Sequence, residues 1–210
     1  MARVSAAAHR LRGIYAIVDA GGRDPVQLTE QLLDGGIRIV QYRAKGGVIA
    51  AHARAMRDLT NERNALFIIN DEWRAVETFD ADGVHLGPDD ANASQWPAIR
   101  QHLRGRILGL SCGTEGEART AQAAGADYIG VGCVFPTKSK SDAGEPIGVA
   151  GLERVAAATS LPVAAIGGIN LSNIAEVYAS GVAMAALISA LSASASPRDT
   201  ARQLVARWNM

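Results

Sequence analysis

The chain has 210 residues, 48% of them hydrophobic, and its 21 basic and 21 acidic side chains cancel to a formal net charge of zero. Without a net positive charge, neither nucleic acid nor an anionic membrane is expected as a partner. The apolar runs are too short to cross a bilayer, the first residues lack the apolar centre of a secretory signal, and two cysteines outside any metal-ligand spacing suit a reducing compartment. We therefore expect a cytoplasmic protein.

Short apolar runs alternate with amphipathic stretches along the chain. Each run is typical of a buried parallel strand. The expected strands are 14–18, 37–41, 66–69, 83–86, 107–111, 128–131, 162–166 and 183–188. The expected helices are 26–34, 50–63, 72–79, 95–103, 115–124, 149–158, 174–179 and 197–208. Thr114 and Glu117 have the spacing of a capping box at the head of one helix.

Eight strands alternating with eight helices predict an α/β fold, a compact (β/α)8 TIM barrel. A weak repeat, in which a helix end is followed by a small residue or glycine and then a strand, supports it, as at 34–37 and 180–183. The alternative is an open doubly wound sheet, but the first strand-to-helix turn, 19–25, has no dinucleotide-binding fingerprint. We expect a single domain over residues 1–210, with 1–12 as an N-terminal extension.

Polar side chains follow the expected strands, where a barrel carries its active site. Asp71 and Asp90 offer hard oxygen ligands from adjacent strands, which suit a Mg²⁺ ion that keeps several waters and bridges phosphates. Arg43, Lys45 and Lys140 supply positive charge for an anion larger than one phosphate. Together these residues predict a magnesium-dependent diphosphate site.

A second anion site is expected on the same face. Residues 166–170 follow the seventh strand and 188–189 end the eighth, where barrels commonly hold a monophosphate through backbone N–H groups. The segment 126–140 passes from an apolar run through two glycines into hydroxyls and lysines, as expected of a strand that ends at an anion site. One diphosphate and one monophosphate site indicate that two phosphorylated small molecules are joined.

Six motifs give the chain a resemblance to a known family. They resemble the motifs of thiamine-phosphate synthase and are Gln41-Tyr42-Arg43-Ala44-Lys45, Ile69-Asn70-Asp71, residues 82–90, residues 126–132, Pro136-Thr137-Lys138-Ser139-Lys140 and Ala165-Ile166-Gly167-Gly168-Ile169. The resemblance runs in order from Tyr15 to about Leu191. It implies a transferase that joins 4-amino-5-hydroxymethyl-2-methylpyrimidine diphosphate to a thiazole monophosphate. The products would be thiamine phosphate and pyrophosphate.

The resemblance also implies roles for individual residues. Mg²⁺ would be bound by Asp71 and Asp90. The pyrimidine diphosphate would be bound by Gln41, Arg43, Lys45, Asn70, Ser111 and Lys140. The thiazole phosphate would be bound by Thr137, Ser139, Gly168, Ile188 and Ser189. The cations would neutralise the departing pyrophosphate while the aminopyrimidine spreads positive charge, which predicts a dissociative, carbocation-like substitution.

The chain departs from the family pattern at three positions near the site. Val18, Pro88 and Gly113 stand where the family often has Thr, Gln, and His or Asn. The polar, glycine-containing segment 138–144 is expected to act as a lid over the substrates. The sequence is compatible with a homo-oligomer and does not determine the oligomeric state.

Two other functions are considered. One is a thiazole tautomerase, an isomerase on the same barrel that keeps the monophosphate site and would use His85 for proton transfer. The other is a non-catalytic phosphate-binding barrel. Neither needs the diphosphate and metal residues, so their joint presence favours the synthase.

Overall fold

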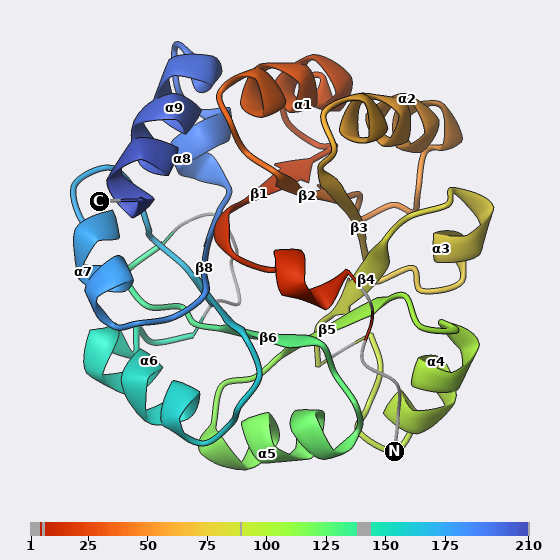
Figure 1. The fold of residues 1–210 in the computed structure, drawn as a ribbon, viewed down its shortest axis with the longest axis vertical. Helices are drawn as coiled ribbons and strands as arrows, with labels where there is room; N and C mark the ends of the chain where they lie inside the picture. Colours follow the sequence, from red (N-terminus) through yellow and green to blue (C-terminus); the bar gives the residue numbers. More distant parts are fainter. Residues whose placement is uncertain (1–4, 6, 89, 138–143, 210) are drawn as a thin grey trace.

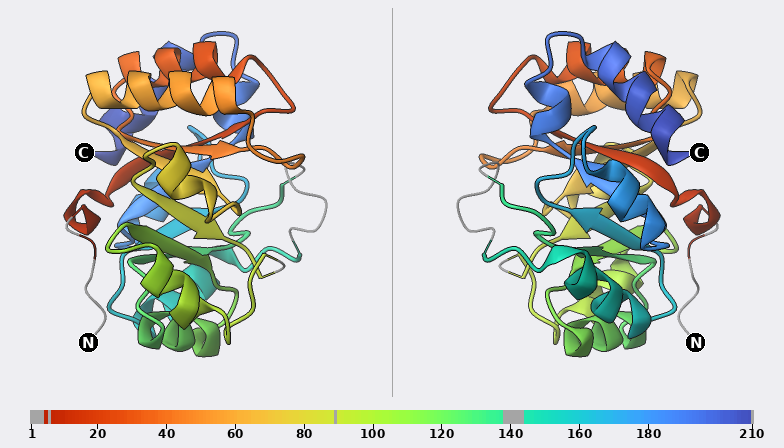
Figure 2. Two further views of the ribbon diagram at one scale, coloured as in Figure 1. Left: turned by 90° about the vertical axis from the view of Figure 1, so that its right-hand side faces the viewer. Right: turned by 90° about the vertical axis from the view of Figure 1, so that its left-hand side faces the viewer.

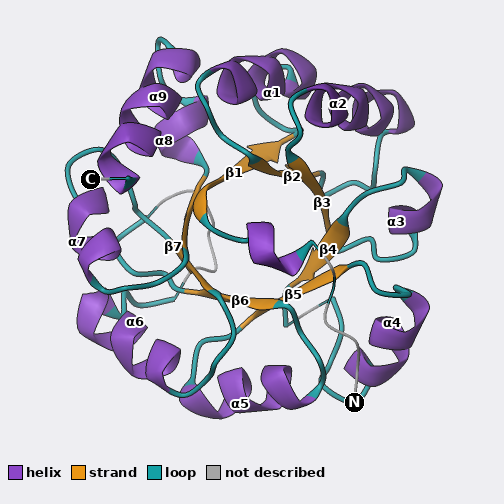
Figure 3. Cartoon of the chain, viewed as in Figure 1, coloured by secondary structure: helices purple, strands orange, loops and turns teal. Residues whose placement is uncertain are grey.

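Eight parallel strands close into a barrel in chain order, each paired with the next and β8 paired with β1. The computed structural model describes residue 5 and residues 7–88, 90–137 and 144–209. A ring of helices surrounds the strands (Figure 1, Figure 3). The predicted (β/α)8 barrel is therefore confirmed. In the part of the chain that is described, no helix has both the length and the apolar character that spanning a membrane requires.

The bounds of the elements follow the expected alternation. The strands are β1 Gly13–Asp19, β2 Ile39–Arg43, β3 Leu66–Asn70, β4 Gly83–Leu86, β5 Ile107–Ser111, β6 Tyr128–Val131, β7 Val163–Ile166 and β8 Met184–Leu187. The helices are the 3-10 helix η1 Ala8–Arg10 and the α-helices α1 Pro25–Asp34, α2 Ala50–Glu62, α3 Ala75–Thr78, α4 Trp96–His102, α5 Glu115–Ala123, α6 Gly148–Ala157, α7 Ile174–Ala179, α8 Ser189–Ser192 and α9 Pro197–Trp208. The predicted capping box is present at the head of α5.

The predicted bounds of the second strand were wrong. β2 begins at Ile39 because Ile37 closes the preceding helix, its N–H donating to the carbonyl of Leu32 at 3.1 Å. The strand continues to Arg43, which pairs in register with Asp19 of β1. Arg43 is therefore part of the barrel wall and not of the loop after it.

Most helix bounds lie within one residue of the prediction, and three helices differ by more. The helix expected over 72–79 shortens to α3, because the backbone turns first at Asp71, whose φ of 66° is left-handed. Neither η1 nor α8 was expected. Each is shorter than the stretch over which helical periodicity can be recognised.

Alternate residues of each strand face the barrel interior, as the period of two requires. The outward set packs beneath the helices and includes Val18, Val40 and Tyr42. The inward set forms a separate buried cluster of Tyr15, Ile17, Ile39, Leu66, Ile68, Ile107, Tyr128, Ala164, Met184 and Ala186, together with Leu11. On β1 to β5 the inward position closest to the carboxyl end is polar, and these residues are Asp19, Arg43, Asn70, His85 and Ser111.

The amino ends of the strands are closed by the segment before β1. Leu11 is 3% exposed and packs with the interior cluster, and Ala7 and Ala8 pack against it. Figure 1 shows η1 lying over the centre of the ring, and in Figure 2 the strand arrows point away from it. Residues 7–12 thus plug one end of the barrel, and the carboxyl ends of the strands form the other face.

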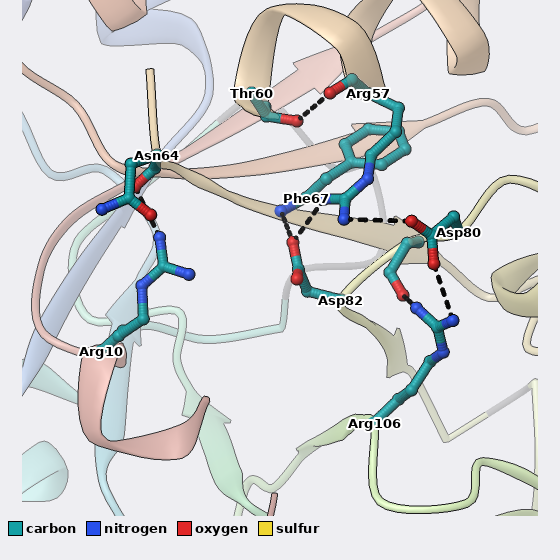
Figure 4. Close-up of polar contacts among 9 residues, drawn as sticks. Arg10, Arg57, Thr60, Asn64, Phe67, Asp80, Asp82 and Arg106 are labelled. Atoms are coloured by element: carbon teal, nitrogen blue, oxygen red, sulfur yellow. Dashed lines mark hydrogen bonds and ion pairs between the residues drawn. The ribbon is translucent and has the colours of Figure 1, made fainter. Parts of the chain in front are cut away.

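Ion pairs reinforce the plugged end (Figure 4). The Oδ2 of Asp82 accepts hydrogen bonds from the Nη1 of Arg57 and from the N–H of Phe67, both at 2.8 Å. Asp80 accepts from the Nη2 of Arg106 at 2.7 Å, and this guanidinium lowers the pKa of the Asp80 carboxyl. These contacts join α2, β3 and the segments before β4 and β5, so this end of the barrel contributes stability.

One ion pair is almost fully buried. The Nη1 of Arg100 contacts the Oδ2 of Asp127 at 2.7 Å, and the two side chains are 7% and 0% exposed. The Asp127 carboxylate also accepts from the N–H groups of Leu108, at 2.8 Å, and Ser5, at 2.7 Å. Asp127 therefore ties α4, the strand β5 and the N-terminal segment to the start of β6.

Asp127→Ala should lower the free energy of unfolding by about 3–5 kcal/mol, because it leaves the Arg100 charge buried without its partner. Urea unfolding followed by circular dichroism measures the change. The control is Asp199→Ala, whose carboxylate is 57% exposed, and it should cost less than about 1 kcal/mol. Equal losses for the two variants would mean that the buried pair is not needed for stability.

Candidate active site

A cavity of about 550 Å³ lies at the carboxyl ends of the strands from β4 to β8. Its wall combines apolar side chains, such as Trp96, Ile169 and Leu187, with a few polar groups. This size and lining are typical of a small-molecule site. Five residues predicted to bind substrate line the cavity, namely Ser111, Thr137, Gly168, Ile188 and Ser189.

A second group of predicted residues lies at the carboxyl ends of β2, β3 and β4. Gln41 and Arg43 lie in β2, with Lys45 exposed in the loop that follows. Asn70 ends β3 and pairs in register with His85 of β4, and the N–H of Asp71 donates to the His85 carbonyl at 2.9 Å.

Two predicted residues cannot be placed. Ser139 and Lys140 lie outside the described residues, as does the predicted lid 138–144 apart from Gly144. The ends of this loop are described, and they are hydrogen-bonded into the barrel. The Phe135 N–H donates to the Gly167 carbonyl at 3.0 Å, and the Ile147 N–H donates to the Cys133 carbonyl at 2.9 Å.

Arg43 is held at the edge of the site by an ion pair that the sequence analysis did not predict. Its Nη1 contacts the Oδ2 of Asp19, its register partner on β1. The Oδ1 of Asp19 accepts from the Gly21 N–H at 2.8 Å, which fixes the carboxylate in turn. The guanidinium therefore has a defined position before any anion binds.

The two predicted metal ligands, Asp71 and Asp90, lie in the loops after β3 and β4. Asp71 is half-buried, and Asp90 is exposed with its Oδ2 accepting from the Gly87 N–H at 2.8 Å. Among the described residues, no group of three or more His, Cys, Asp or Glu side chains is arranged to hold a metal. Mg²⁺ is commonly bound by one or two carboxylates plus substrate phosphates and waters. The donor set fits that pattern and does not resemble a closed structural site.

Two glycines let the loop after β7 pack against the loop after β6. Gly167 and Gly168 have φ angles of 103° and 66°, which side chains rarely adopt. A Cβ on Gly168 would lie 2.5 Å from the Pro136 carbonyl oxygen and 2.7 Å from the Phe135 Cβ. A bulky residue at Gly168 would therefore displace the segment that carries Thr137. A substitution at Gly168 would therefore change the position of Thr137 as well, and its effect could not be assigned to Gly168 alone.

A chain of four hydrogen bonds crosses the barrel interior from Gln41 to Ser111. The Nε2 of Gln41 donates to the Tyr15 hydroxyl at 2.6 Å, and the hydroxyls of Tyr15 and Tyr128 are 2.8 Å apart. The Tyr128 hydroxyl lies 3.0 Å from the Nδ1 of His85, whose Nε2 lies 3.0 Å from the Ser111 Oγ. The sequence analysis missed both tyrosines. The available signal was a phenol hydroxyl at an inward position of each of two buried strands, where it needs a hydrogen-bond partner.

The two cysteines, Cys112 and Cys133, are free, buried and part of the cavity wall, as expected of small buried residues. Burial raises the pKa of the Cys112 thiol to about 12, and the negative charge of Glu117 adds to the effect. At neutral pH this side chain is a thiol and not a thiolate, so it is a poor nucleophile.

Alkylation tests this protonation state. At pH 8, iodoacetamide should modify Cys112 of the folded protein at least about a hundredfold more slowly than free cysteine, because the thiolate fraction is small. Mass spectrometry of the Cys112 peptide over time gives the rate, and the same peptide in urea-unfolded protein serves as the control. Modification at the unfolded rate would contradict the predicted pKa.

Comparison with known proteins identifies the family. Residues 14–191 match the family model described as thiamine monophosphate synthase. The chain belongs to the thiamine monophosphate synthase family. The matched residues nearly coincide with the range, Tyr15 to about Leu191, over which the motifs resemble that family.

Individual relatives agree with the family model. The thiamine-phosphate synthase of Archaeoglobus fulgidus is 43% identical over 196 residues, covering 91% of each chain. That of Moorella thermoacetica is 42% identical over 198 residues, covering 91% of this chain and 93% of the other. The solved structure of thiamine phosphate pyrophosphorylase from Pyrococcus furiosus is 33% identical, with a TM-score of 0.86 over 95% of this chain and 96% of that one. The expectation of an enzyme of the thiamine-phosphate synthase type is thus confirmed.

Proposed function

We propose that this enzyme joins 4-amino-5-hydroxymethyl-2-methylpyrimidine diphosphate to a thiazole monophosphate, giving thiamine phosphate and pyrophosphate. Family membership supports this reaction. The observation that carries it is the division of one face into two parts. Cations and carboxylates occupy the ends of β2 to β4, and a cavity with hydroxyl and glycine groups occupies the ends of β4 to β8.

The first part would bind the diphosphate. Arg43, Lys45, Asn70 and Lys140 would contact its oxygens, and Asp71 and Asp90 would hold Mg²⁺. When bound, Mg²⁺ supplies positive charge that stabilises departing pyrophosphate. The Asp19 ion pair orients the Arg43 guanidinium in advance, which reduces the reorganisation needed when the diphosphate binds.

The second part would bind the thiazole phosphate. The thiazole ring would then lie between the diphosphate and this phosphate. Thr137, Ser139, Gly168, Ile188 and Ser189 would hold the phosphate. The pyrimidine would lie between the two parts, in contact with Gln41 of β2 and Ser111 of β5. This arrangement would hold the thiazole nitrogen close to the methylene carbon of the pyrimidine substrate, which carries the diphosphate.

The substitution needs no nucleophilic side chain. The bond between the methylene carbon and the diphosphate oxygen breaks, and its electron pair leaves with pyrophosphate. The lone pair of the thiazole nitrogen then forms the new carbon–nitrogen bond. Because the aminopyrimidine spreads positive charge, we propose a dissociative, carbocation-like path. The protonated Cys112 thiol is consistent with a site that does no covalent catalysis.

The proposed setting follows from the same chemistry. The substrates are small phosphorylated molecules, and we place the enzyme in the cytoplasm, where two free buried cysteines stay reduced. The oligomeric state is left open, and a homo-oligomer is compatible with the proposal.

The central experiment measures thiamine phosphate formed from the two precursors, with and without Mg²⁺, for the unmodified protein and for Asp90→Asn. Asparagine can still accept the Gly87 hydrogen bond, so the loop should keep its shape. We expect kcat to fall on the order of a hundredfold or more, because the metal contributes several kcal/mol and about 1.4 kcal/mol corresponds to tenfold. Raising Mg²⁺ should restore part of the loss.

Asp24→Asn is the matched control, since the Asp24 carboxylate also accepts backbone N–H groups but caps α1. It should leave kcat within about twofold of the unmodified value. If Asp90→Asn is silent, Mg²⁺ is dispensable and the protein catalyses a thiazole isomerisation that His85→Asn abolishes, the tautomerase is the correct function instead.

Thr137→Val tests the thiazole phosphate site. Valine keeps the shape and removes the hydroxyl, so KM for the thiazole phosphate should rise about tenfold, the loss of a hydrogen bond to a charged group. KM for the pyrimidine diphosphate should stay within about twofold. Thr120→Val, which removes a hydroxyl on α5 bonded to the Gly116 carbonyl, is the control. A rise in KM for both substrates would mean that Thr137 does not belong to a separate thiazole site.

A further inference from the structure

The donor at Gln41 implies one direction for the hydrogen bonds that run from Gln41 to Ser111 inside the barrel. An amide nitrogen can only donate, so the Tyr15 hydroxyl accepts from Gln41 and turns its own proton to Tyr128. Tyr128 then donates to the Nδ1 of His85, which in a neutral imidazole places the proton on Nε2. This proton is donated to the Ser111 Oγ. A hydroxyl oxygen can accept twice, but only this direction gives the Tyr15 proton a partner among these four hydrogen bonds, so the donor at Gln41 sets the direction of the other three.

The two ends of this hydrogen-bond network consequently differ: one offers an acceptor to a ligand and the other offers a donor. At one end, the amide oxygen of Gln41 remains an acceptor. At the other end, the Ser111 hydroxyl accepts from His85 and can turn its proton into the cavity that it lines. With the opposite direction, both ends would reverse, so that Gln41 would donate and Ser111 would accept.

The barrel makes room for this chain with two glycines on inward positions. A Cβ on Gly109 of β5 would lie 2.5 Å from the Tyr128 hydroxyl. A Cβ on Gly130 of β6 would lie 3.0 Å from the Cε1 of His85. The Tyr128 ring is also stacked on His85, with the ring centres 5.4 Å apart at an angle of 28°, and meets Tyr15 edge-on at 5.9 Å. Packing therefore holds all three rings in place.

Burial keeps the two phenols protonated, because it raises the pKa of both Tyr15 and Tyr128. Each can therefore supply the single proton that the directed chain requires. A buried network of this kind is stable when every member is satisfied, and it then holds its groups in one arrangement.

We propose that Tyr15, Tyr128 and His85 are positioning residues that fix the hydrogen-bonding sense of Gln41 and Ser111, so that the site selects a 4-aminopyrimidine over the 4-oxo form. This inference rests on the proposed function, in which Gln41 and Ser111 contact the pyrimidine. The amino group donates to the amide oxygen of Gln41, and a ring nitrogen accepts from Ser111. A 4-oxo group would instead place an acceptor against the Gln41 oxygen, which leaves both unpaired.

The test compares two probes, the monophosphates of the 4-amino and the 4-oxo hydroxymethylpyrimidines, by isothermal titration calorimetry. In the unmodified protein the 4-amino compound should bind at least about tenfold more tightly. Tyr15→Phe removes the acceptor of the Gln41 amide, and Tyr128→Phe removes the group that takes the Tyr15 proton, so that in either variant the Gln41 amide can reverse. Each should therefore lower this preference about tenfold, which is about 1.4 kcal/mol.

Tyr42→Phe is the matched control. Tyr42 is a buried tyrosine of β2 whose hydroxyl also contacts an imidazole, the Nδ1 of His52 at 3.3 Å, but it belongs to the outward set beneath the helices. It should leave the preference unchanged, and all three variants should keep the KM for the thiazole phosphate within about twofold. A purely structural role of the tyrosines would weaken both probes equally.

Several results would overturn the inference: an unchanged preference in both Tyr15→Phe and Tyr128→Phe, no binding of the 4-amino probe to the unmodified protein, or tighter binding of the 4-oxo probe. Tighter binding of the 4-oxo probe would mean that the hydrogen bonds between Gln41 and Ser111 run in the opposite direction. Failure to form thiamine phosphate would remove the proposed function, whereas calorimetry still decides the selectivity, because it needs no turnover. The two tyrosine positions give independent measurements if one variant does not fold.

Discussion

The closure of eight parallel strands into a ring is the constraint on which the rest of this structure depends. Closure leaves no free sheet edge, so every strand must hold its register against two neighbours, and the side chains must alternate strictly between the interior and the helices. Along β2, this rule turns Ile39, Gln41 and Arg43 to the same side. The alternation that buries Ile39 in the interior therefore also places Gln41 and Arg43 on the inward side, toward the carboxyl end of the barrel.

Much of the fold follows from local patterns in the sequence. Apolar runs of four to seven residues, ended by polar groups or glycine, mark the strands, and β4, β5 and β6 have the predicted bounds. The bounds of β2 could not be read in this way, because Ile37 is apolar and buried yet serves to close α1. The position of residues 7–12 could not be read from the sequence either. Nothing local in Ala8 to Leu11 indicates that they fill the end of a barrel formed by residues far along the chain.

In the site too, some features could be predicted from local sequence and others could not. The polar residues at strand ends could be predicted because a barrel gathers them on one face, and Ser111, Thr137, Gly168, Ile188 and Ser189 do line one cavity. The pairing of Arg43 with Asp19 depends on register, and the contact of Tyr15 with Tyr128 joins strands that are not neighbours. Such contacts across the ring have no sequence spacing that could indicate them.

The plug formed by η1 and Leu11 lies at the end of the barrel opposite the carboxyl ends of the strands. Together with the interior cluster it fills the barrel, so in the described part of the chain no path runs from the cavity to the amino ends of the strands. A segment at the far end of the barrel thereby shields the apolar interior from water, at the end opposite the one where the polar residues gather.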